Sequence, residues 1–348
     1  MNISEIDRNF LVAPSFAGKD LVFYDVDEAP FRVYGVQREN GCYRRIPEQL
    51  ARSVSNGVTR LHTCTAGGRV RFVTDSPYIA IRAELHNVGK MSHIPFTGSV
   101  GLDLYREKQY IGTFRPPFDV TDVLDDVIST HCPTNAEYTI NFPLYSGMTR
   151  LFVGVKKGSS LMRAKDYVSE RPIVFYGSSI TQGGCASRAG NAYTSIVSRR
   201  LGYDHINLGF SGSAKGEDAM ADYVASLNAV LFVYDYDHNA PNVEHLAQTH
   251  ERFFMRVREQ RPTLPVLMMT RPKFYLNDEE RARLEIVRST YENACARGDQ
   301  NVYFLPGPSL ISEWVREEAL VDNCHPNDAG FASMAMAVER AIREILAL

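Results

Sequence analysis

The sequence predicts two classes of structure in one chain: a jelly-roll-like β sandwich over residues 1–165, then a three-layer α/β/α domain with a parallel sheet over residues 166–348. At 348 residues the chain is longer than most single domains, which favours two domains. The first part contains many short runs of strand character and no convincing long amphipathic helix. In the second part apolar runs alternate with helical patterns, which is typical of βαβ units.

The first part shows the period-two alternation of strands with one buried face. In residues 78–85, apolar side chains at 79, 81, 83 and 85 alternate with Arg82 and Glu84. Residues 149–155 repeat the pattern, and further short runs bounded by Gly, Pro and Asn lie at 101–105, 110–114 and 138–143. This spacing of short strands predicts a sandwich.

A polar stretch at residues 156–160 is interpreted as the link between the two parts. Beyond it the predicted strands lie at 173–176, 204–208, 229–235, 265–269 and 302–305, and the predicted helices at 191–201, 216–227, 243–260, 278–297 and 327–347. The last helix has the clearest apolar spacing of three and four residues, and Asn327 is its predicted N-cap.

The composition is that of an ordinary globular protein, with 44% hydrophobic residues, 23% charged residues and a formal net charge of −3. No block of Lys and Arg indicates nucleic acid, and no run of about twenty apolar residues indicates a membrane span. The polar, acidic start does not have the pattern of a signal peptide, so a cytoplasmic location is expected if Met1 is the native start. The scattered cysteines are interpreted as free thiols: Cys42, Cys64, Cys132, Cys185, Cys295 and Cys324.

The candidate nucleophile is Ser179, in the segment GSSIT at residues 177–181. It follows the apolar run 173–176, which is predicted to be a strand buried on both faces. In a parallel sheet the C-terminal strand ends meet where ligands bind, so the serine is expected at that edge. Two other motifs are excluded: the α/β-hydrolase elbow needs Gly where Thr181 stands, and the glycine spacing does not fit a dinucleotide fingerprint.

Three later segments supply candidate partners at the same edge of the predicted sheet. Gly212 and Asn239 each follow a predicted strand, where a backbone N–H and a side-chain amide would reach one substrate oxygen. Asp322 lies three residues before His325, so its carboxylate would accept the imidazole Nδ1–H while Nε2 takes the serine proton. Taken alone, Asp322 and His325 would be interpreted as part of a capping turn, and Gly212 or Asn239 as an ordinary turn residue.

Ser, Gly, Asn and Asp-x-x-His in this order resemble the SGNH (GDSL-type) hydrolase family, over about residues 170–348. The resemblance implies that Ser179 is the nucleophile and that Asp322 and His325 complete a catalytic triad. It also implies that Gly212 and Asn239 form an oxyanion hole with the Ser179 N–H. No metal or organic cofactor is needed for this chemistry.

The chain departs from the family pattern at three positions. Ser178 stands where the opening G-D-S block has Asp, and in the third block Asp237 and Ala240 replace Gly and Asp. The D-x-x-x-N spacing seen in many members is kept by Asp235 and Asn239, so Asn239 is retained as the oxyanion donor.

The run GLDLY at residues 101–105 resembles the G-x-D-L-Y signature of a β domain that precedes the hydrolase domain in a set of bacterial proteins. This second resemblance implies a two-domain esterase similar to bacterial carbohydrate acetylesterases, acting on an acylated carbohydrate or another small ester. The alternatives are a lipase or thioesterase for longer acyl chains, and a carbohydrate-binding protein on a decayed hydrolase scaffold. Asp103 is interpreted as a turn-stabilising carboxylate.

Two further residues near the predicted active edge are candidates for facing the substrate, namely His238 and Arg271. His238 is interpreted as facing the substrate or supporting the site, whereas for Arg271 the alternative is a solvated loop charge, which is common for an arginine after a strand. The spacing of His, Asp and Cys matches no known metal site, so no metal is expected. The sequence leaves the oligomeric state open.

Overall fold

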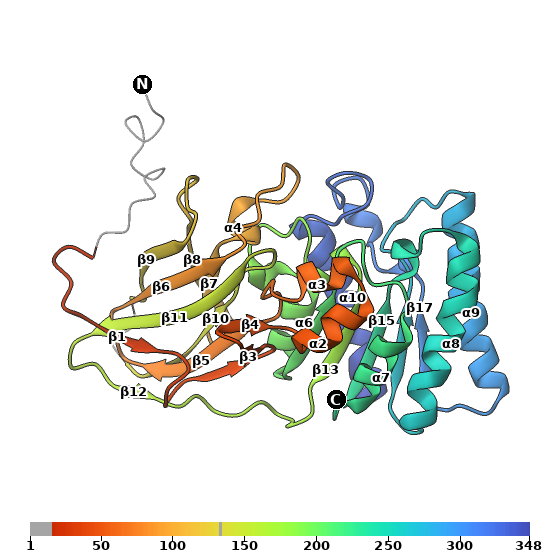
Figure 1. The fold of residues 1–348 in the computed structure, drawn as a ribbon, viewed down its shortest axis with the longest axis horizontal. Helices are drawn as coiled ribbons and strands as arrows, with labels where there is room; N and C mark the ends of the chain where they lie inside the picture. The colour runs from red at the N-terminus through yellow and green to blue at the C-terminus, as the bar shows by residue number, and fades with distance from the viewer. Residues whose placement is uncertain (1–15, 132–133) are drawn as a thin grey trace.

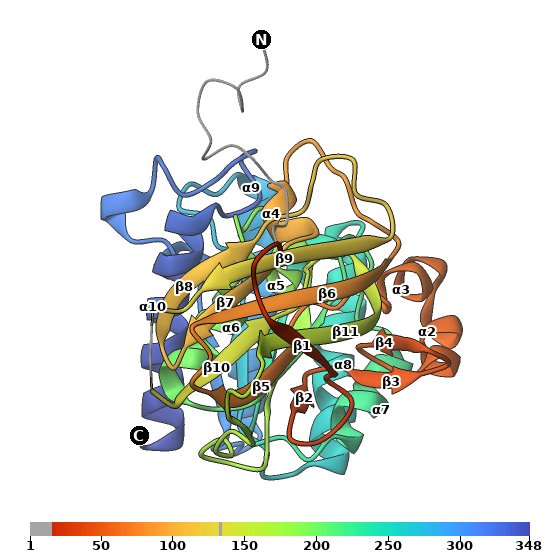
Figure 2. The same cartoon turned by 90° about the vertical axis from the view of Figure 1, so that its left-hand side faces the viewer.

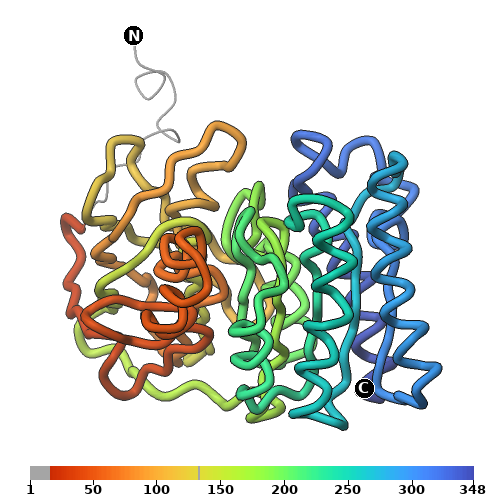
Figure 3. Tube along the Cα trace, turned by 45° about the vertical axis from the view of Figure 1, so that its right-hand side comes forward, coloured from red at the N-terminus to blue at the C-terminus, as the bar shows by residue number. Residues whose placement is uncertain are grey.

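The computed structural model describes residues 16–131 and 134–348, and it has the predicted fold class: an antiparallel β region followed by an α/β region with a parallel sheet. Figure 1 shows the two regions side by side along the long axis, and Figure 3 shows the segment that carries β13 and α6 between the β region and the outer helices. The interpretations of Met1 as the native start and of Cys132 as a free thiol lie outside the described residues.

The β region consists of two antiparallel sheets and a small hairpin (Figure 2). One sheet has the order β1 (Leu21–Asp25), β11 (Gly147–Lys156), β6 (Tyr78–His86) and β9 (Val123–Ser129). The other has the order β12 (Leu161–Met162), β5 (Arg69–Thr74), β10 (Ala136–Asn141), β7 (Leu102–Arg106) and β8 (Gln109–Phe114), with β2 (Arg32–Tyr34) also paired to β5. The hairpin is formed by β3 (Gln37–Glu39) and β4 (Cys42–Arg44).

Period-two alternation decides which side chains enter the core between these sheets. In β6 the side chains of Ile79, Ile81 and Ala83 are fully buried in that core, whereas Arg82 points out and pairs with Asp125. Burying one such aliphatic side chain stabilises the folded state by about 1.5–3 kcal/mol. The alternation therefore determines which face of the strand lies in the core. The predicted sandwich is therefore confirmed.

The parallel sheet has the order β14 (His205–Gly209), β13 (Ile173–Gly177), β15 (Leu231–Asp235), β16 (Val266–Met269) and β17 (Val302–Leu305). One face is covered by α6 (Tyr193–Leu201) and α10 (Asp328–Leu346), and the other by α7 (Asp218–Ser226), α8 (Val243–Gln260) and α9 (Asp278–Ala296). The central strand β13 shows why helices must cover both faces of the sheet. Its Val174 and Tyr176 enter the core on one face, and its Ile173 and Phe175 enter the core on the other.

The helix ends carry the capping residues that the sequence indicates. Asn327 caps α10, since its side-chain oxygen accepts hydrogen bonds from Ala329 N at 2.9 Å and Gly330 N at 3.2 Å. At the start of α9, Asn277 and Glu280 form a reciprocal capping box. The predicted N-cap of the last helix is confirmed.

Two helices of the first part were not predicted, α2 (Glu48–Val54) and α3 (Asn56–Leu61). They lie against the α/β region beside α7 (Figure 1). Ile46, Ala51 and Val58 are fully buried in the same core as Leu208 and Phe210 of the parallel-sheet region. Residues from the first part of the sequence thus complete a core of the second.

Asp103 of the GLDLY run does not stabilise a turn, as the sequence interpretation had it; it lies within strand β7 and is fully buried. Its carboxylate accepts from Asn141 Nδ2 at 2.8 Å, Gly190 N at 2.8 Å and Arg188 Nη1 at 3.1 Å. Gly190 and Arg188 lie just after the nucleophile segment, at the 3₁₀ helix η2 (Ala189–Asn191). The carboxylate therefore joins the β region to the α/β region.

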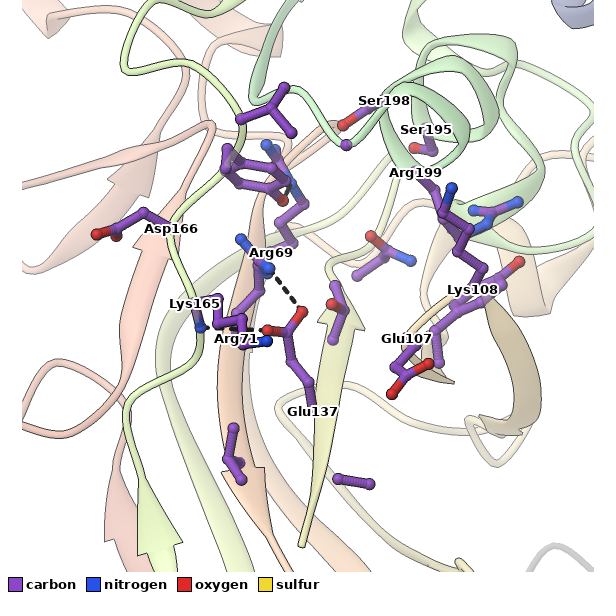
Figure 4. Close-up of a pocket in the computed structure, with 18 of the residues that line it drawn as sticks. Arg69, Arg71, Glu107, Lys108, Glu137, Lys165, Asp166, Ser195, Ser198 and Arg199 are labelled. Carbon is purple, nitrogen blue, oxygen red and sulfur yellow. Dashed lines mark hydrogen bonds and ion pairs between the residues drawn. The ribbon is translucent and has the colours of Figure 1, made fainter.

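A cavity of about 520 Å³ lies between the outward face of the β5–β10–β7 sheet, the linker at residues 165–168 and α6 (Figure 4). Its charged groups pair with one another: Arg71 donates to Glu137 at 2.6 Å, and Arg69 forms an ion pair with Asp204. Arg69 thus binds the two regions together, whereas the Arg71 pair lies within the β region.

The five cysteines in the described part of the chain are unpaired, as interpreted from the sequence: Cys42, Cys64, Cys185, Cys295 and Cys324. Within the described residues, no helix combines the length and apolar character required to span a bilayer.

Candidate active site

Ser179 is the first residue of the short helix α5 (Ser179–Gln182), directly after β13. Ser178 is the N-cap, and its Oγ accepts from Ile180 N at 3.1 Å. Gly177 permits this turn because a Cβ there would overlap the backbone oxygen of Asp235 and the hydroxyl of Thr181. The strand–turn–helix geometry therefore holds Ser179 at the C-terminal edge of the sheet.

His325 and Asp322 are brought to Ser179 by the loop before α10. The Ser179 Oγ lies 2.8 Å from His325 Nε2, and His325 Nδ1 lies 2.8 Å from Asp322 Oδ2. The other carboxylate oxygen of Asp322 accepts from His325 N at 2.8 Å and Cys324 N at 3.1 Å. Both ring nitrogens of the histidine are thus oriented, which is the geometry of a Ser-His-Asp triad.

The loop also sets the charge state of the histidine. A hydrogen bond with the Cys324 side chain, opposed by burial and supported by Asp322, raises the pKa of His325 to about 9. Partial burial raises the pKa of Asp322, but the backbone and ring N–H groups of His325 outweigh it and lower the pKa overall. The imidazolium form of His325 is therefore favoured.

A pH dependence follows from this raised pKa. His325 must be neutral to accept the Ser179 proton, so we expect kcat/KM for an ester to rise with pH through about 9. Replacing Cys324 with alanine removes the largest cause of the upward shift. The inflection in the pH–rate profile should then move down by about one pH unit, measured as kcat/KM from pH 6 to 10.

The matched control is Cys295→Ala, because Cys295 is an exposed thiol on α9. Its profile should coincide with that of the wild type. An unchanged inflection in Cys324→Ala would contradict the assignment of the shift to the Cys324 side chain.

Gly212 and Asn239 lie on the loops after β14 and β15. Gly212 has a φ of +64°, a conformation that favours glycine, and in the described residues its N–H donates to no acceptor. The Ser179 N–H, at the first position of α5, is likewise without an acceptor in the described part of the chain. Asn239 Nδ2 donates to Phe210 O at 3.0 Å, which uses one of its two amide hydrogens. Three donors therefore have hydrogens left for a substrate oxygen.

The loop that carries Gly212 is held by Gln182 and by Arg45 of the β region. Gln182 Oε1 accepts from Ser211 N at 3.0 Å, and its Nε2 donates to Leu144 O at 3.1 Å. Arg45 is buried, donates to Gly209 O, and lies with its guanidinium 4.4 Å from the centre of the Phe210 ring. The start of the loop, at residues 209–211, thus depends on contacts with the first part of the chain.

The β region also reaches the triad itself. Tyr145 OH donates to Ser179 O at 3.3 Å and makes a hydrogen bond with Ser211. The ring of His93, from the loop between β6 and α4 (Phe96–Ser99), has its centre 5.5 Å from that of His325. Sequence reasoning missed both residues, since neither lies in a motif.

A cleft of about 590 Å³ adjoins this site. Tyr145 and Ser211 form its inner wall, and the rest comes mainly from α3 and the loop at residues 87–91. The β region therefore supplies most of the cleft beside the candidate nucleophile.

The two other predicted site residues, His238 and Arg271, lie on a separate small cavity of about 140 Å³. His238 Nδ1 lies 3.1 Å from Asp237 Oδ1. Arg271 Nη1 donates to Glu280 at 2.7 Å and its Nη2 donates to Asn323 O at 3.1 Å. Arg271 thus holds the loop that carries the triad histidine.

Three groups of side chains in the described residues place potential metal-ligand atoms within 4.8 Å of one another: His93–Cys185–His325, Asp322–Cys324–His325 and Asp235–Asp237–His238. The first two share His325, whose ring nitrogens already face Ser179 and Asp322. In the third, burial raises the pKa of Asp235 well above its usual value, which favours the neutral acid, a poor ligand.

Comparison with known proteins agrees with both halves of this arrangement. The model of the GDSL-like lipase/acylhydrolase family matches residues 170–343, and that of the N-terminal GxDLY region of SGNH-type esterases matches residues 21–161. No curated protein matches the chain.

Several solved structures are similar over nearly the whole chain. A Bacteroides ovatus protein provisionally assigned as a GDSL-like lipase is 26% identical, with a TM-score of 0.85 over 94% of this chain and 98% of its own. A salicylyl-acyltransferase from a tetracycline biosynthetic pathway is 20% identical, with a TM-score of 0.77 over 95% and 99%. An acetyl xylan esterase from Butyrivibrio proteoclasticus is 14% identical, with a TM-score of 0.62 over 94% and 99%, and at these identities the last two share the fold.

The lipase/acylhydrolase model alone matches half of the chain, and the GxDLY model covers most of the remainder. The protein therefore belongs to the GDSL-like lipase/acylhydrolase family and is a carboxylic ester hydrolase.

Proposed function

We propose that the protein removes acetyl or other small acyl groups from carbohydrates by a Ser-His-Asp mechanism. The observation that carries this proposal is the continuous hydrogen-bonded line from Ser179 Oγ through His325 to Asp322, with 2.8 Å at each step. In addition, the N–H groups of Ser179 and Gly212 have no acceptor among the described residues.

In the first half of the reaction Ser179 Oγ attacks the acyl carbonyl carbon while His325 takes the hydroxyl proton. The carbonyl oxygen becomes negative and is bound by the N–H groups of Ser179 and Gly212 and the amide of Asn239. Each such donor is worth about 3 kcal/mol in the transition state, and the general base about 10²–10⁴-fold. The sugar oxygen leaves with the proton held by His325, and the acyl group remains on Ser179.

In the second half, water loses a proton to His325 and attacks the acyl-serine carbonyl. The bond to Ser179 Oγ breaks, the serine regains its proton from His325, and the carboxylic acid is released. Asp322 accepts the Nδ1–H throughout and stabilises the imidazolium that forms in each half.

Support for a carbohydrate substrate comes from the architecture. The acetyl xylan esterase of Butyrivibrio proteoclasticus, and a family two carbohydrate esterase of Cellvibrio japonicus that is 11% identical with a TM-score of 0.62, have the same fold over 94% of this chain. The cleft beside Ser179 is lined in part by charged and hydroxyl groups, including Arg60, Lys90 and Ser213.

The main alternative is a lipase or thioesterase for longer acyl chains, and acyl-length dependence separates the two. We expect kcat/KM for p-nitrophenyl acetate to exceed that for p-nitrophenyl octanoate by at least about tenfold, because each additional methylene needs apolar wall to bind it. Acetate release from acetylated xylo-oligosaccharides tests the carbohydrate part directly. A preference for octanoate would favour the lipase, and a folded protein inactive on all esters would favour a binding protein.

A further inference from the structure

The cleft beside the candidate nucleophile is positively charged and contains no acidic group to balance it. In the described part of the chain its lining includes Arg60 and Lys90, and no Asp or Glu. The two cations come from different segments, Arg60 from α3 and Lys90 from the loop after β6. Two cations without a balancing acid, on the wall of a cleft beside the candidate site, attract an anionic ligand.

Arg60 is the freer of the two groups. Its side chain is exposed, and within the described residues its guanidinium makes no hydrogen bond, ion pair or ring contact. Most of the chain's other arginines pair with an acid, as Arg82 does with Asp125 at 2.7 Å. A planar guanidinium without a partner has its full set of donors available for a carboxylate.

Lys90 is held in a defined position. Its Nζ donates to Phe118 O at 2.6 Å and lies 5.2 Å from the centre of the Phe118 ring and 5.5 Å from that of Phe96. These contacts use one of its three donors and do not neutralise its charge. Lys90 therefore adds positive potential at a fixed place on the wall.

Arg45 adds a further positive charge next to the cleft. It is buried, its donors go to the carbonyl oxygens of Gly209 and Leu61, and no described carboxylate pairs with it. Leu61 and its neighbour Arg60 both line the cleft. Arg60 and Lys90 thus line the cleft, Arg45 contacts its Leu61, and none of the three pairs with a described carboxylate.

The cavity in Figure 4 differs from this cleft in that acids stand among its cations. Its lining contains Glu107, Glu137 and Asp166 among the cations, and Arg71 is paired with Glu137. Arg69, also on its wall, forms an ion pair with Asp204 and so joins the two regions. The unbalanced cleft has no such role, because Arg60 touches no other charged group.

We propose that the protein selects acylated sugars that carry a carboxylate, that is, esters of uronic acid units, with Arg60 of the cleft beside the candidate nucleophile as the carboxylate-binding group and Lys90 in support. The inference rests on the proposed function. The planar guanidinium of Arg60 can form two parallel hydrogen bonds with a carboxylate; it can bind a phosphate in the same way, and the third substrate below separates the two. The Gly89 N–H on this wall is already used by Ser146 Oγ at 3.0 Å.

The test compares substrates that differ only in charge. Acetylated galacturonate oligosaccharides are offered with free carboxylates and with the carboxylates as methyl esters, and acetate release is measured. We expect kcat/KM to be about tenfold higher for the free acid at low salt, and the ratio to approach one at about 0.5 M salt. Acetylated glucose 6-phosphate is the third substrate, which separates carboxylate from phosphate recognition.

The variant Arg60→Gln should lower the acid-to-methyl-ester ratio to about one third of its wild-type value or less, through KM rather than kcat. The matched control is Arg340→Gln, since Arg340 is an exposed arginine of α10 far along the chain from the cleft and makes no ion pair with a described residue. Lys90→Gln provides a second, independent variant, expected to act in the same direction.

A wild-type ratio near one, with normal hydrolysis of p-nitrophenyl acetate, overturns this inference and leaves the proposed function standing. Preference for the phosphate over the galacturonate substrate also overturns it. Equal losses in Arg60→Gln and Arg340→Gln would show that the preference is a general charge effect and not a site at Arg60. Absence of hydrolysis on every ester is a different result, which overturns the proposed function.

Discussion

Replacing Ser179 with alanine is expected to lower ester hydrolysis by about 10⁴-fold or more while leaving the fold intact. The change removes only the Oγ atom, whose hydrogen-bond partner is His325 Nε2 at 2.8 Å. Capping of α5 is unaffected, because that hydrogen bond belongs to Ser178. Without Oγ no acyl-enzyme forms, and the oxyanion donors alone leave only residual activity. Initial rates on p-nitrophenyl acetate measure the loss.

The control for Ser179→Ala is Ser226→Ala, a serine exposed at the end of α7. Both variants should have the thermal midpoint of the wild type within about one degree. Residual activity above about one per cent in Ser179→Ala, with contaminating esterase excluded, would show that another group is the nucleophile.

Replacing Asp103 with alanine is expected to destabilise the whole protein by about 3–5 kcal/mol. The carboxylate is fully buried and accepts from Asn141, Gly190 and Arg188, so the change leaves three donors and one arginine charge unsatisfied. The free energy of unfolding, measured by urea denaturation, reports the loss. The temperature at which esterase activity disappears should fall with it.

The comparison variant is Asp125→Ala, which breaks the exposed pair between Asp125 and Arg82 in the same region. Exposed pairs contribute about 0–1 kcal/mol, so this variant should remain close to the wild type. Equal losses of stability in Asp103→Ala and Asp125→Ala would show that the buried carboxylate of Asp103 does not hold the two regions together.

Much of the fold was predictable because it depends on local periodicity. The alternation in residues 78–85 corresponds to β6, and the alternating strands and helices after residue 172 match β13 to α10 within a few residues. The helices α2 and α3 were not predictable in this way. They are short, and their apolar residues, such as Ala51 and Val58, are buried only because the α/β region lies against them.

The candidate site likewise contains some residues that the sequence could predict and others that it could not. Ser179 begins the helix after β13, Gly212 and Asn239 follow β14 and β15 within a few residues, and Asp322 and His325 lie in the loop before α10, so the topology of a parallel sheet predicts them at one edge. Their meeting was deducible from order and spacing.

Other residues at the site had no sequence signal of this kind. Tyr145, His93, Arg45 and Arg60 come from loops and short elements of the β region, and they reach the site only through long-range packing between the two regions. Predicting them would have required the orientation of one region on the other.

The anchoring of the Gly212 loop by Arg45 and by Leu144, through Gln182, has a consequence for protein engineering. A chimera that exchanges the β region at the linker would cut the chain at one point but replace the groups that hold the oxyanion donors. The substrate range of this protein therefore cannot be transferred by exchanging the β region alone. A successful exchange has to carry Arg45, Leu144 and Tyr145 with it, so that the donor loop keeps the same partners in the new molecule.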